Sequence, residues 1–396
     1  GEMIVVTHEV MVPTNFSGTY FVGAYTDSLG EITELVEDVD ASFASQGDNV
    51  LVDDFTPLFQ IASSTAPTTI PVSEVSDGNG GLVTASYGAS DNPSVSEDGV
   101  WIAFQSTATN LDPDLAGTGN SNIYLRNRRT EEVVLISRSN GGIIGNRDSY
   151  NPAISADGKY IVYESLATNL VSGAQGAGSQ IYIYDVLLGR TDRISVDSSG
   201  IAANGSCYTP SISEDGRFIV FESLATNLDP SFETALTSSN ATQVFVHDRD
   251  ANATGTFGIN YATHLISSNL GVPADSDVFT PKISMDARVV VFASAASNLG
   301  IGANGFIQVW SRELGPDGVP MSEPSLVSWN ASGTDGGNGD SVEPAINGGP
   351  TTADYGTQIA FASIADDLIA SDTNEIADIF IRDYSDTANP VTVRAS

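Results

Sequence analysis

The sequence predicts an all-β protein: a β-propeller of four-stranded antiparallel sheets, preceded by a small N-terminal β-sandwich-like segment. Three observations predict it. One phrase recurs five times, short alternating strand patterns follow each copy, and no helical periodicity occurs within the copies. Small antiparallel sheets repeated about every 60 residues bury both of their faces by packing radially.

The repeated phrase joins a polar turn to an alternating strand. Its copies are "NPSVSEDGVWIAFQSTATNL" from Asn92, "NPAISADGKYIVYESLATNL" from Asn151, "TPSISEDGRFIVFESLATNL" from Thr209, "TPKISMDARVVVFASAASNL" from Thr280 and a looser "EPAINGGPTTADYGTQIAFASIADDL" from Glu343. The turn aspartates of the first four copies, Asp98, Asp157, Asp215 and Asp286, are spaced by 59, 58 and 71 residues. Two further short strands after each phrase complete a four-stranded unit.

Within each unit the residues have separate structural roles. The Asp-Gly turn predicts a tight hairpin, because glycine supplies a positive φ and the aspartate caps its own turn. Ala287 replaces this glycine in the fourth copy, and we expect the turn to adjust there. The Asn of "ATNL" is expected to bond backbone groups in the loop that follows the second strand. The side chains expected to pack between neighbouring blades are Tyr163, Phe221, Phe292 and Phe361.

The sequence shows the repeated unit more clearly than it shows the number of blades. Five complete copies are present, yet Pro57 to Gly81 can be laid over the end of the fifth copy as a third and fourth strand. We therefore favour six blades over five, with the sixth assembled from roughly residues 49–76. The predicted domains are a partial immunoglobulin-like segment at 1–48, a transition and incomplete blade at 49–90, and five propeller repeats at 91–396.

The phrases "SISEDGRFIVFES" and "QIYIYD" resemble the WD40-like repeats of TolB-type β-propellers. The resemblance covers roughly Asp91 to Ser396. It implies a role as an interaction platform or as a non-catalytic partner of other domains, because propellers of this type serve mainly in that way. It implies six blades as well.

The first forty residues resemble the second half of a bacterial cell-adhesion-related immunoglobulin-like module. Gly18, Tyr20, Asp27, Glu34 and Glu37 occupy the positions of that pattern, whereas "EDVD" replaces its paired asparagines. Half a sandwich leaves open strand edges that strands from elsewhere must cover. Either these strands pack onto the rest of the chain, or a further segment or a second copy covers them by strand addition.

Composition limits the partners. The formal net charge is -35, with 50 acidic residues against 15 basic ones, and Lys159 and Lys282 are the two lysines. Such a polyanion is repelled by phosphate backbones, which excludes nucleic acid as a partner. No apolar run reaches the roughly 20 residues that span a bilayer, so no membrane insertion is expected. A single cysteine, Cys207, excludes an intrachain disulfide.

These features favour a non-enzymatic, exported or surface-associated propeller that binds a protein or a surface glycan. We expect an extracellular, cell-surface or periplasmic location. No G-x-S-x-G nucleophile pattern occurs. Two alternatives remain: a subunit of an extracellular filament that binds other copies of itself through the N-terminal β segment, and a hydrolase-type enzyme with a site at the central channel.

One loop predicts a metal site. In "SDTNEIAD" of the fifth copy, Asp372, Asn374 and Asp378 offer oxygen ligands of the kind that Ca²⁺ prefers, and Glu375 could join them. The corresponding loops of the other copies are neutral, so the site would be confined to this copy. The alternative is a solvated acidic loop that binds no metal.

Overall fold

In the computed structural model, the described part of the chain comprises 88–396 without 112–118, 174–175, 237–240, 348–356, 371, 373, 375 and 387–388, together with short pieces at 23–26, 32–36, 72–73, 75–76 and 82–83. Contacts divide the chain into two units, Gly1–Pro71 and Val72–Ser396. In the first unit β1 (Gly23–Thr26) pairs antiparallel with β2 (Ile32–Val36). The immunoglobulin-like pattern otherwise lies outside the described residues and stays a prediction, as do the domain boundaries.

Five four-stranded antiparallel sheets make up most of the second unit, as far as it is described. In order, they contain β5 (Ser90–Val95), β6 (Trp101–Ser106), β7 (Asn122–Asn127) and β8 (Val133–Leu135); β9 (Ser149–Ile154), β10 (Tyr160–Ser165), β11 (Gln180–Asp185) and β12 (Arg190–Arg193); β13 (Cys207–Ile212), β14 (Phe218–Ser223), β15 (Gln243–Asp248) and β16 (Ala262–Leu265); β19 (Val278–Ile283), β20 (Val289–Ser294), β21 (Gln308–Glu313) and β22 (Ser325–Leu326); β23 (Ser341–Ile346), β24 (Gln358–Ser363), β25 (Asp378–Asp383) and β26 (Val391–Arg394). Each sheet is one copy of the predicted unit. The remaining elements are the hairpins β3 (Val75–Ser76) with β4 (Leu82–Val83) and β17 (Ser268–Asn269) with β18 (Val272–Pro273), and the one-turn helix α1 (Glu233–Leu236).

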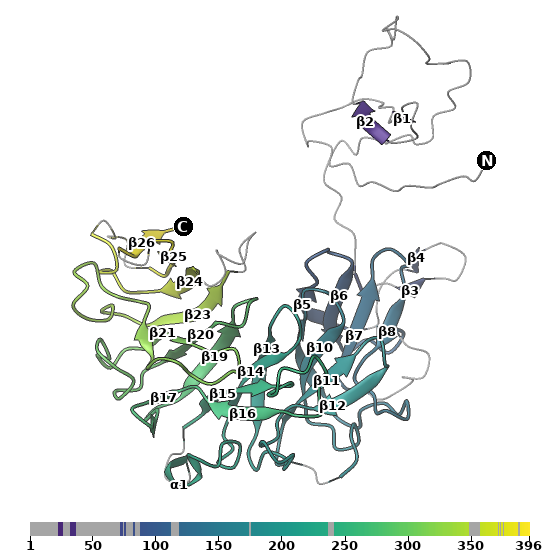
Figure 1. The fold of residues 1–396 in the computed structure, drawn as a ribbon, viewed down its shortest axis with the longest axis horizontal. Coiled ribbons are helices and arrows are strands. Elements are labelled where there is room, and N and C mark those ends of the chain that lie inside the picture. Colours follow the sequence, from purple (N-terminus) through teal and green to yellow (C-terminus); the bar gives the residue numbers. More distant parts are fainter. Residues whose placement is uncertain are drawn as a thin grey trace, which may run out of the picture. The chain divides into compact units, whose positions relative to one another are not determined.

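The sheets are arranged as propeller blades (Figure 1). Each sheet packs on the next one along the chain, and the first strands β5, β9, β13, β19 and β23 pack on one another in that order. These five are called the inner strands below. The predicted all-β propeller of four-stranded antiparallel sheets is thereby confirmed.

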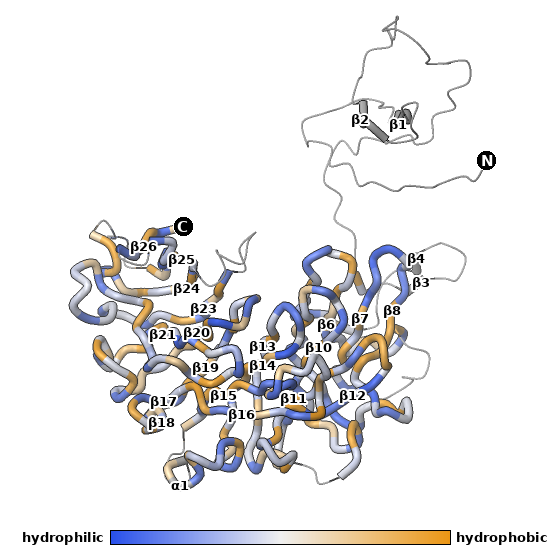
Figure 2. The backbone as a smooth tube through the Cα atoms, viewed as in Figure 1, coloured by the Kyte–Doolittle hydropathy of each residue, from blue (hydrophilic) through white to orange (hydrophobic). Residues whose placement is uncertain are grey.

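The core lies between the sheets rather than within one of them. The four predicted aromatic side chains are all buried, and each belongs to a cluster that joins its own sheet to the preceding one: Tyr163, Phe221, Phe292 and Phe361. The apolar residues accordingly follow the strands in Figure 2. The ring of Phe221 also stacks on Phe245 of the neighbouring strand at 6.2 Å between centroids, which ties the packing of adjacent strands together.

The predicted turn is present in four sheets with one hydrogen-bond pattern. In the third sheet the Ser213 hydroxyl donates to Asp215 Oδ1 at 2.7 Å, and the same oxygen accepts the Arg217 N–H at 2.9 Å. Neighbouring turns are also connected, because the Ala156 N–H donates to the Glu214 carbonyl at 3.1 Å. The repeated turn therefore joins strands within a sheet and also joins adjacent sheets.

The turn glycine has a second role that the sequence pattern does not reveal. Gly216 has φ +74°, and a Cβ there would lie 2.3 Å from the ring of Tyr160 in the preceding sheet. Gly158 stands in the same relation to Trp101, at 2.4 Å. In the fourth sheet Ala287 takes this place at φ +60° and is buried. Glycine is thus required twice in the second and third sheets, for its φ and for the close approach of an aromatic ring.

The Asn of "ATNL" does bond backbone, but in a different loop from the expected one. Asn169 Nδ2 donates to the Ile144 carbonyl at 2.8 Å, and Asn169 Oδ1 accepts the Asn146 N–H at 2.9 Å. Ile144 and Asn146 belong to the loop that enters the same sheet from the preceding one. The same contact recurs at Asn227 and Asn298, so the motif closes the second, third and fourth sheets against their own entry loops.

The described start of the second unit supports a sixth sheet. Arg126 of β7 donates to the Val72 carbonyl at 2.8 Å, and Val72 packs against the cluster formed by β6 and β7. Arg312, at the same position in the fourth sheet, donates to the carbonyl of Ile266, which directly follows β16, the fourth strand of the preceding sheet. Val72 thus stands where the last strand of a preceding sheet would end, in agreement with a six-bladed propeller.

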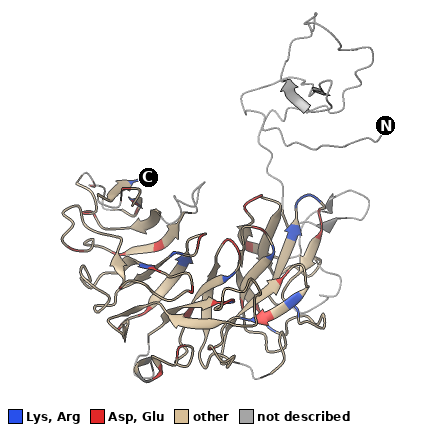
Figure 3. Cartoon of the chain, viewed as in Figure 1, with Lys and Arg blue, Asp and Glu red and all other residues tan. Residues whose placement is uncertain are grey.

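Figure 3 shows how few basic residues the chain carries against its acidic ones. Within the part of the chain that is described, no helix is both long and apolar enough to cross a membrane.

Candidate functional site

Each inner strand holds one residue in a left-handed conformation just before a proline. The residues are Asn92, Asn151, Thr209, Thr280 and Glu343, with φ between 45° and 53°. The pairing register shifts at this point in every sheet, so each marks a β-bulge. Residues before proline normally adopt extended conformations, and other contacts must therefore hold these five in place.

For the first four of these residues, such contacts come from one position on the second strand of a sheet, which we call the acceptor position. It holds Gln105, Glu164, Glu222, Ala293 and Ala362 in the five sheets. Gln105 Oε1 accepts the N–H of Asn151 in the next sheet at 3.0 Å, and Glu222 Oε1 accepts the N–H of Thr280 at 2.7 Å. Glu164 accepts the N–H of Thr209 in the same way.

The left-handed residue itself also donates to the acceptor position of its own sheet. Asn92 bonds Gln105 at 3.2 Å, and Asn151 bonds Glu164 at 3.1 Å. The Thr209 hydroxyl bonds Glu222 in the third sheet. In each of the first three sheets, one acceptor side chain thus receives two donors, one from its own inner strand and one from the next.

The fourth sheet breaks this arrangement. Ala293 holds the acceptor position and offers no side-chain oxygen, and the buried Thr280 Oγ1 has no hydrogen-bond partner in the described part of the chain. An unpaired buried hydroxyl costs on the order of 1–3 kcal/mol. The fifth sheet has Ala362 at the same position, and its left-handed residue Glu343 is exposed.

Two carboxyl groups remain buried at the acceptor positions of the second and third sheets. Glu164 and Glu222 are 7% and 8% exposed. Burial raises the pKa of both carboxyls, and hydrogen bonds such as those from Ser179 and Thr209 oppose this shift. The charge of Glu164 raises the pKa of Glu222 further, whereas Lys282 lowers it.

Lys282 lies on β19, two residues after Thr280. Its side chain is exposed, but it stands on an inner strand with sheets on both sides, and the resulting desolvation lowers the pKa of the ammonium group. Glu222 partly opposes this shift. The other lysine, Lys159, has an ion pair with Asp157 at 2.7 Å. Among the described residues the Lys282 ammonium has no hydrogen bond or ion pair within such a distance.

We call Thr280, Lys282, Ala293 and Glu343 the inner-strand site. They lie on β19, β20 and β23, which pack on one another. The site combines an unpaired hydroxyl, a desolvated ammonium and an exposed carboxylate at the one place where a threonine bulge lacks its acceptor. Sequence reasoning missed it, although the sequence does show the acceptor position changing from Gln or Glu to Ala along the copies.

The residues predicted to bind Ca²⁺ are brought together, with an arginine between them. Arg394 Nη1 lies 3.3 Å from Asp372 Oδ1 and 3.4 Å from Asp378 Oδ2. Asn374 donates to Asp378 at 2.9 Å, and this bond, with help from Ser396 and Arg394, lowers the pKa of the Asp378 carboxyl. Glu375 lies outside the described residues.

The guanidinium occupies a position between the carboxylates that a cation would share. Over the described residues, no group of three or more His, Cys, Asp or Glu side chains is placed to hold a metal ion. Calcium binding by Asp372, Asn374 and Asp378 stays a prediction.

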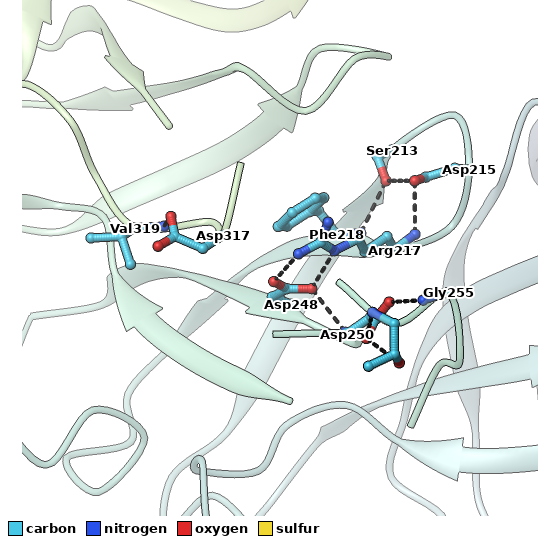
Figure 4. Close-up of polar contacts among 10 residues, drawn as sticks. Ser213, Asp215, Arg217, Phe218, Asp248, Asp250, Gly255, Asp317 and Val319 are labelled. Carbon is cyan, nitrogen blue, oxygen red and sulfur yellow. Dashed lines mark hydrogen bonds and ion pairs between the residues drawn. The ribbon is translucent and has the colours of Figure 1, made fainter. Parts of the chain in front are cut away.

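A second buried charge pair is structural. Arg217 makes two hydrogen bonds of 2.7 Å to the fully buried Asp248, and its guanidinium lies 4.5 Å from the Phe218 ring centroid (Figure 4). The loop around Gly318 of the fourth sheet packs on this group, since a Cβ at Gly318 would lie 3.0 Å from Phe218. The Arg217 side chain is 15% exposed and that of Asp248 is fully buried, and the cluster joins the third and fourth sheets.

No family model matches the chain, and no curated protein sequence matches it. Solved structures do match its fold. TolB from Acinetobacter baumannii is 14% identical with a TM-score of 0.40, over 82% of this chain and 59% of that one. A putative TolB from Agrobacterium tumefaciens is 15% identical with a TM-score of 0.42, over 78% and 82%. Oligogalacturonate lyase from Vibrio parahaemolyticus is 15% identical with a TM-score of 0.42, over 76% and 63%. The chain thus spans less than two thirds of the first and third of these proteins.

The structural neighbours are TolB-like and other β-propeller proteins, and at these identities the likeness concerns the fold alone. They correct one expectation, that the chain is not an enzyme. Prolyl endopeptidases, the tricorn protease and an acylaminoacyl peptidase from Pyrococcus horikoshii share the fold, as does the lyase. The lack of a G-x-S-x-G pattern excludes one serine-hydrolase arrangement only, so the fold gives no ground for excluding catalysis.

Proposed function

We propose that this chain is an exported or cell-surface β-propeller that binds a protein partner at the inner strands of its fourth and fifth sheets. The observation that carries the proposal is the break in the repeat at Ala293. In the first three sheets the side chains of the left-handed residues find acceptors within the protein. At the inner-strand site the Thr280 hydroxyl and the Lys282 ammonium have no hydrogen-bond or ion-pair partner among the described residues, and Glu343 on the adjacent inner strand is exposed.

Unmatched polar groups on a rigid scaffold favour binding over a purely structural role. A Glu side chain at the acceptor position stabilises the repeat. Its replacement by alanine in two consecutive sheets is therefore not explained by stability. The fold likeness to TolB agrees with such a role but carries no weight in the argument. An extracytoplasmic location rests on the resemblance and on the acidic composition.

Two alternatives to a protein partner are a surface glycan and other copies of this chain. A surface glycan would use exposed hydroxyl and carboxylate groups, and other copies of the chain would use the N-terminal β segment at 1–40. Most of that segment lies outside the described residues, and self-assembly stays a prediction. The inner-strand site favours a protein partner because it presents charged groups of both signs, Lys282 and Glu343.

Site-specific photo-crosslinking tests the proposal. A benzophenone amino acid replaces Ala345, which is exposed on β23 beside Glu343, and a matched control replaces Leu188, exposed in the turn between β11 and β12. With extracytoplasmic fractions of the source cells, we expect one defined adduct from position 345 and none from position 188. Equal labelling from both positions, or none from 345, would contradict binding at the inner strands.

A further inference from the structure

We propose that the β17–β18 hairpin, with Leu270 at its tip, is an anchor for a partner protein that presents an apolar pocket flanked by basic side chains. The hairpin follows β16, which lies at the opposite edge of the third sheet from the inner strand β13. This surface is therefore a second one, and neither proposal needs the other. The observation behind it is a leucine that is both exposed and held in a conformation that leucine disfavours.

The turn of this hairpin places a large residue in the left-handed region. Asn269 pairs with Val272, so Leu270 and Gly271 form a two-residue turn, and their φ values are +49° and +77°. Positive φ at both positions defines a type I′ turn, whose first position favours Asn, Asp or Gly. The left-handed conformation crowds the Cβ of leucine against a backbone carbonyl oxygen and costs free energy. The leucine therefore does not stabilise the turn.

The corresponding turns between the other described sheets avoid this cost. They enclose five or six residues between the bridge partners, whereas this hairpin encloses four. In each of those turns a glycine takes the left-handed position: Gly142, Gly200 and Gly333. Among the described connections between sheets, the third-to-fourth one is alone in placing a large apolar residue there.

Solvent does not favour this leucine either. Leu270 is 81% exposed, and Val272 on the same hairpin is 55% exposed. Backbone strain persists where the surrounding structure enforces it, and it is often found where a function requires it. A contact with another molecule accounts for both the strain and the exposure, because it would bury the side chain in the conformation that it already has.

The tip is held in place before any partner binds. The Leu270 N–H donates to Glu323 Oε2 at 3.0 Å, and Asn269 Nδ2 donates to the Asn298 carbonyl at 2.8 Å. Glu323 in turn lies 3.6 Å from the buried guanidinium of Arg312. An anchor that is already ordered loses little conformational entropy on binding, which favours affinity.

The charge around the tip limits the kind of partner. The Glu323 side chain is 47% exposed, and Asp275, just after the hairpin, is exposed as well. Basic side chains at the rim of the partner's pocket would be attracted to both carboxylates, whereas an acidic partner would be repelled. Binding to a lipid surface increases with the apolar area that is buried, and one leucine with one valine offers little. The hairpin therefore fits a protein pocket better than a membrane.

Stability and binding should change in opposite directions in the variant Leu270→Asn. Asparagine is favoured at this position of a type I′ turn, so we expect a higher melting temperature than that of the wild type. The matched control Leu187→Asn changes a leucine that is 84% exposed in the turn between β11 and β12 and has no positive φ. A lower melting temperature for Leu270→Asn would mean that the leucine supports the fold, and would overturn the inference.

Binding is tested with a benzophenone amino acid at Val272 of the full chain, in extracytoplasmic fractions of the source cells. Mass spectrometry identifies the protein in the adduct, and that protein is then purified and titrated with the wild type and both variants. We expect the affinity to fall about tenfold or more in Leu270→Asn and to stay within about twofold in Leu187→Asn. We also expect it to weaken as salt is added, because the basic rim is attracted to the acidic tip.

Four results would overturn the inference. They are the absence of an adduct from position 272, equal affinity for the wild type and Leu270→Asn, affinity that does not depend on salt, and binding of the wild type but not Leu270→Asn to phosphatidylcholine vesicles. The last result would assign the hairpin to a lipid surface. Crosslinking from position 345 reports on the inner-strand site separately, so the proposed function can stand where this inference fails, and the reverse.

Discussion

The second and third sheets follow the repeat, whereas the fourth and fifth depart from it at the same two places. Gly158 and Gly216 lie under aromatic rings where the fourth sheet has Ala287. Glu164 and Glu222 join adjacent sheets where the later sheets have Ala293 and Ala362. Both pairs of sheets keep the same strands and the same bulge. The difference teaches that the bulge does not require the acceptor, so the glutamates contribute stability to a bulge that forms without them.

The largest effect is expected at the turn glycines. Gly216→Ala would place a Cβ against the Tyr160 ring at φ +74°, and we expect a loss of about 3 kcal/mol in the free energy of unfolding. The matched change Ala287→Gly removes a Cβ that the fourth sheet already accommodates, and should stay within about 1 kcal/mol. Urea unfolding measures both. Equal losses would mean that the ring contact is unimportant.

A somewhat smaller effect is expected at the acceptor position. Glu222→Ala leaves the donors of Thr209 and Thr280 unpaired at a buried position, which should cost about 2 kcal/mol. Glu222→Gln keeps an oxygen there and should cost less. The reverse change, Ala293→Glu, should leave stability unchanged or raise it by up to about 1 kcal/mol. A loss on Ala293→Glu comparable to that of Glu222→Ala would show that the fourth sheet has no room for the carboxyl.

The same comparison extends to pH. The folded pKa of Glu164 and of Glu222 is raised by burial, so the folded protein binds more protons than the unfolded chain above about pH 4.3, the ordinary value for Glu. Each group therefore lowers stability as the pH rises from there through its folded pKa. Relative to the double variant Glu164→Gln, Glu222→Gln, the wild type should lose stability over this interval. Parallel stability curves of the two proteins would contradict the raised pKa values.

The sequence predicted the blade well, because its instructions are local. The Ser-Asp turn, the alternating strands and the Asn of "ATNL" act within one copy, and repetition made them visible. The contacts between sheets were harder to predict. Glu222 meets Thr280 across 58 residues, and the Tyr160 ring above Gly216 leaves no trace in the turn pattern itself. The inner-strand site was hard to predict for the same reason. It is recognised only when the acceptor positions of different sheets are compared and Ala293 is found where other sheets have Gln or Glu.

The acidic loop shows the same limit. The structure brings Asp372, Asn374 and Asp378 close together, but Arg394 follows Asp378 by 16 residues and is not part of the loop pattern. Its guanidinium reaches both Asp372 and Asp378. A prediction based on the loop alone had no means of placing it.

The smallest effect is expected at this loop, where the fifth sheet differs from the neutral loops of the second and third. With Arg394 between the carboxylates, Ca²⁺ must displace a guanidinium before it binds. A dissociation constant near 1 mM is typical of weak extracellular sites, and stabilisation by 1 mM Ca²⁺ would then be only about 0.4 kcal/mol. The variant Arg394→Gln frees both carboxylates and should increase the shift in melting temperature on adding Ca²⁺, and Asp372→Ala should abolish it. Thermal melts in Ca²⁺ and in a chelator measure all three proteins. If the melting temperature of Arg394→Gln does not change on adding Ca²⁺, the loop binds no calcium even when its oxygens are free. If the melting temperature of the wild type falls by several degrees in chelator, the guanidinium does not compete with calcium.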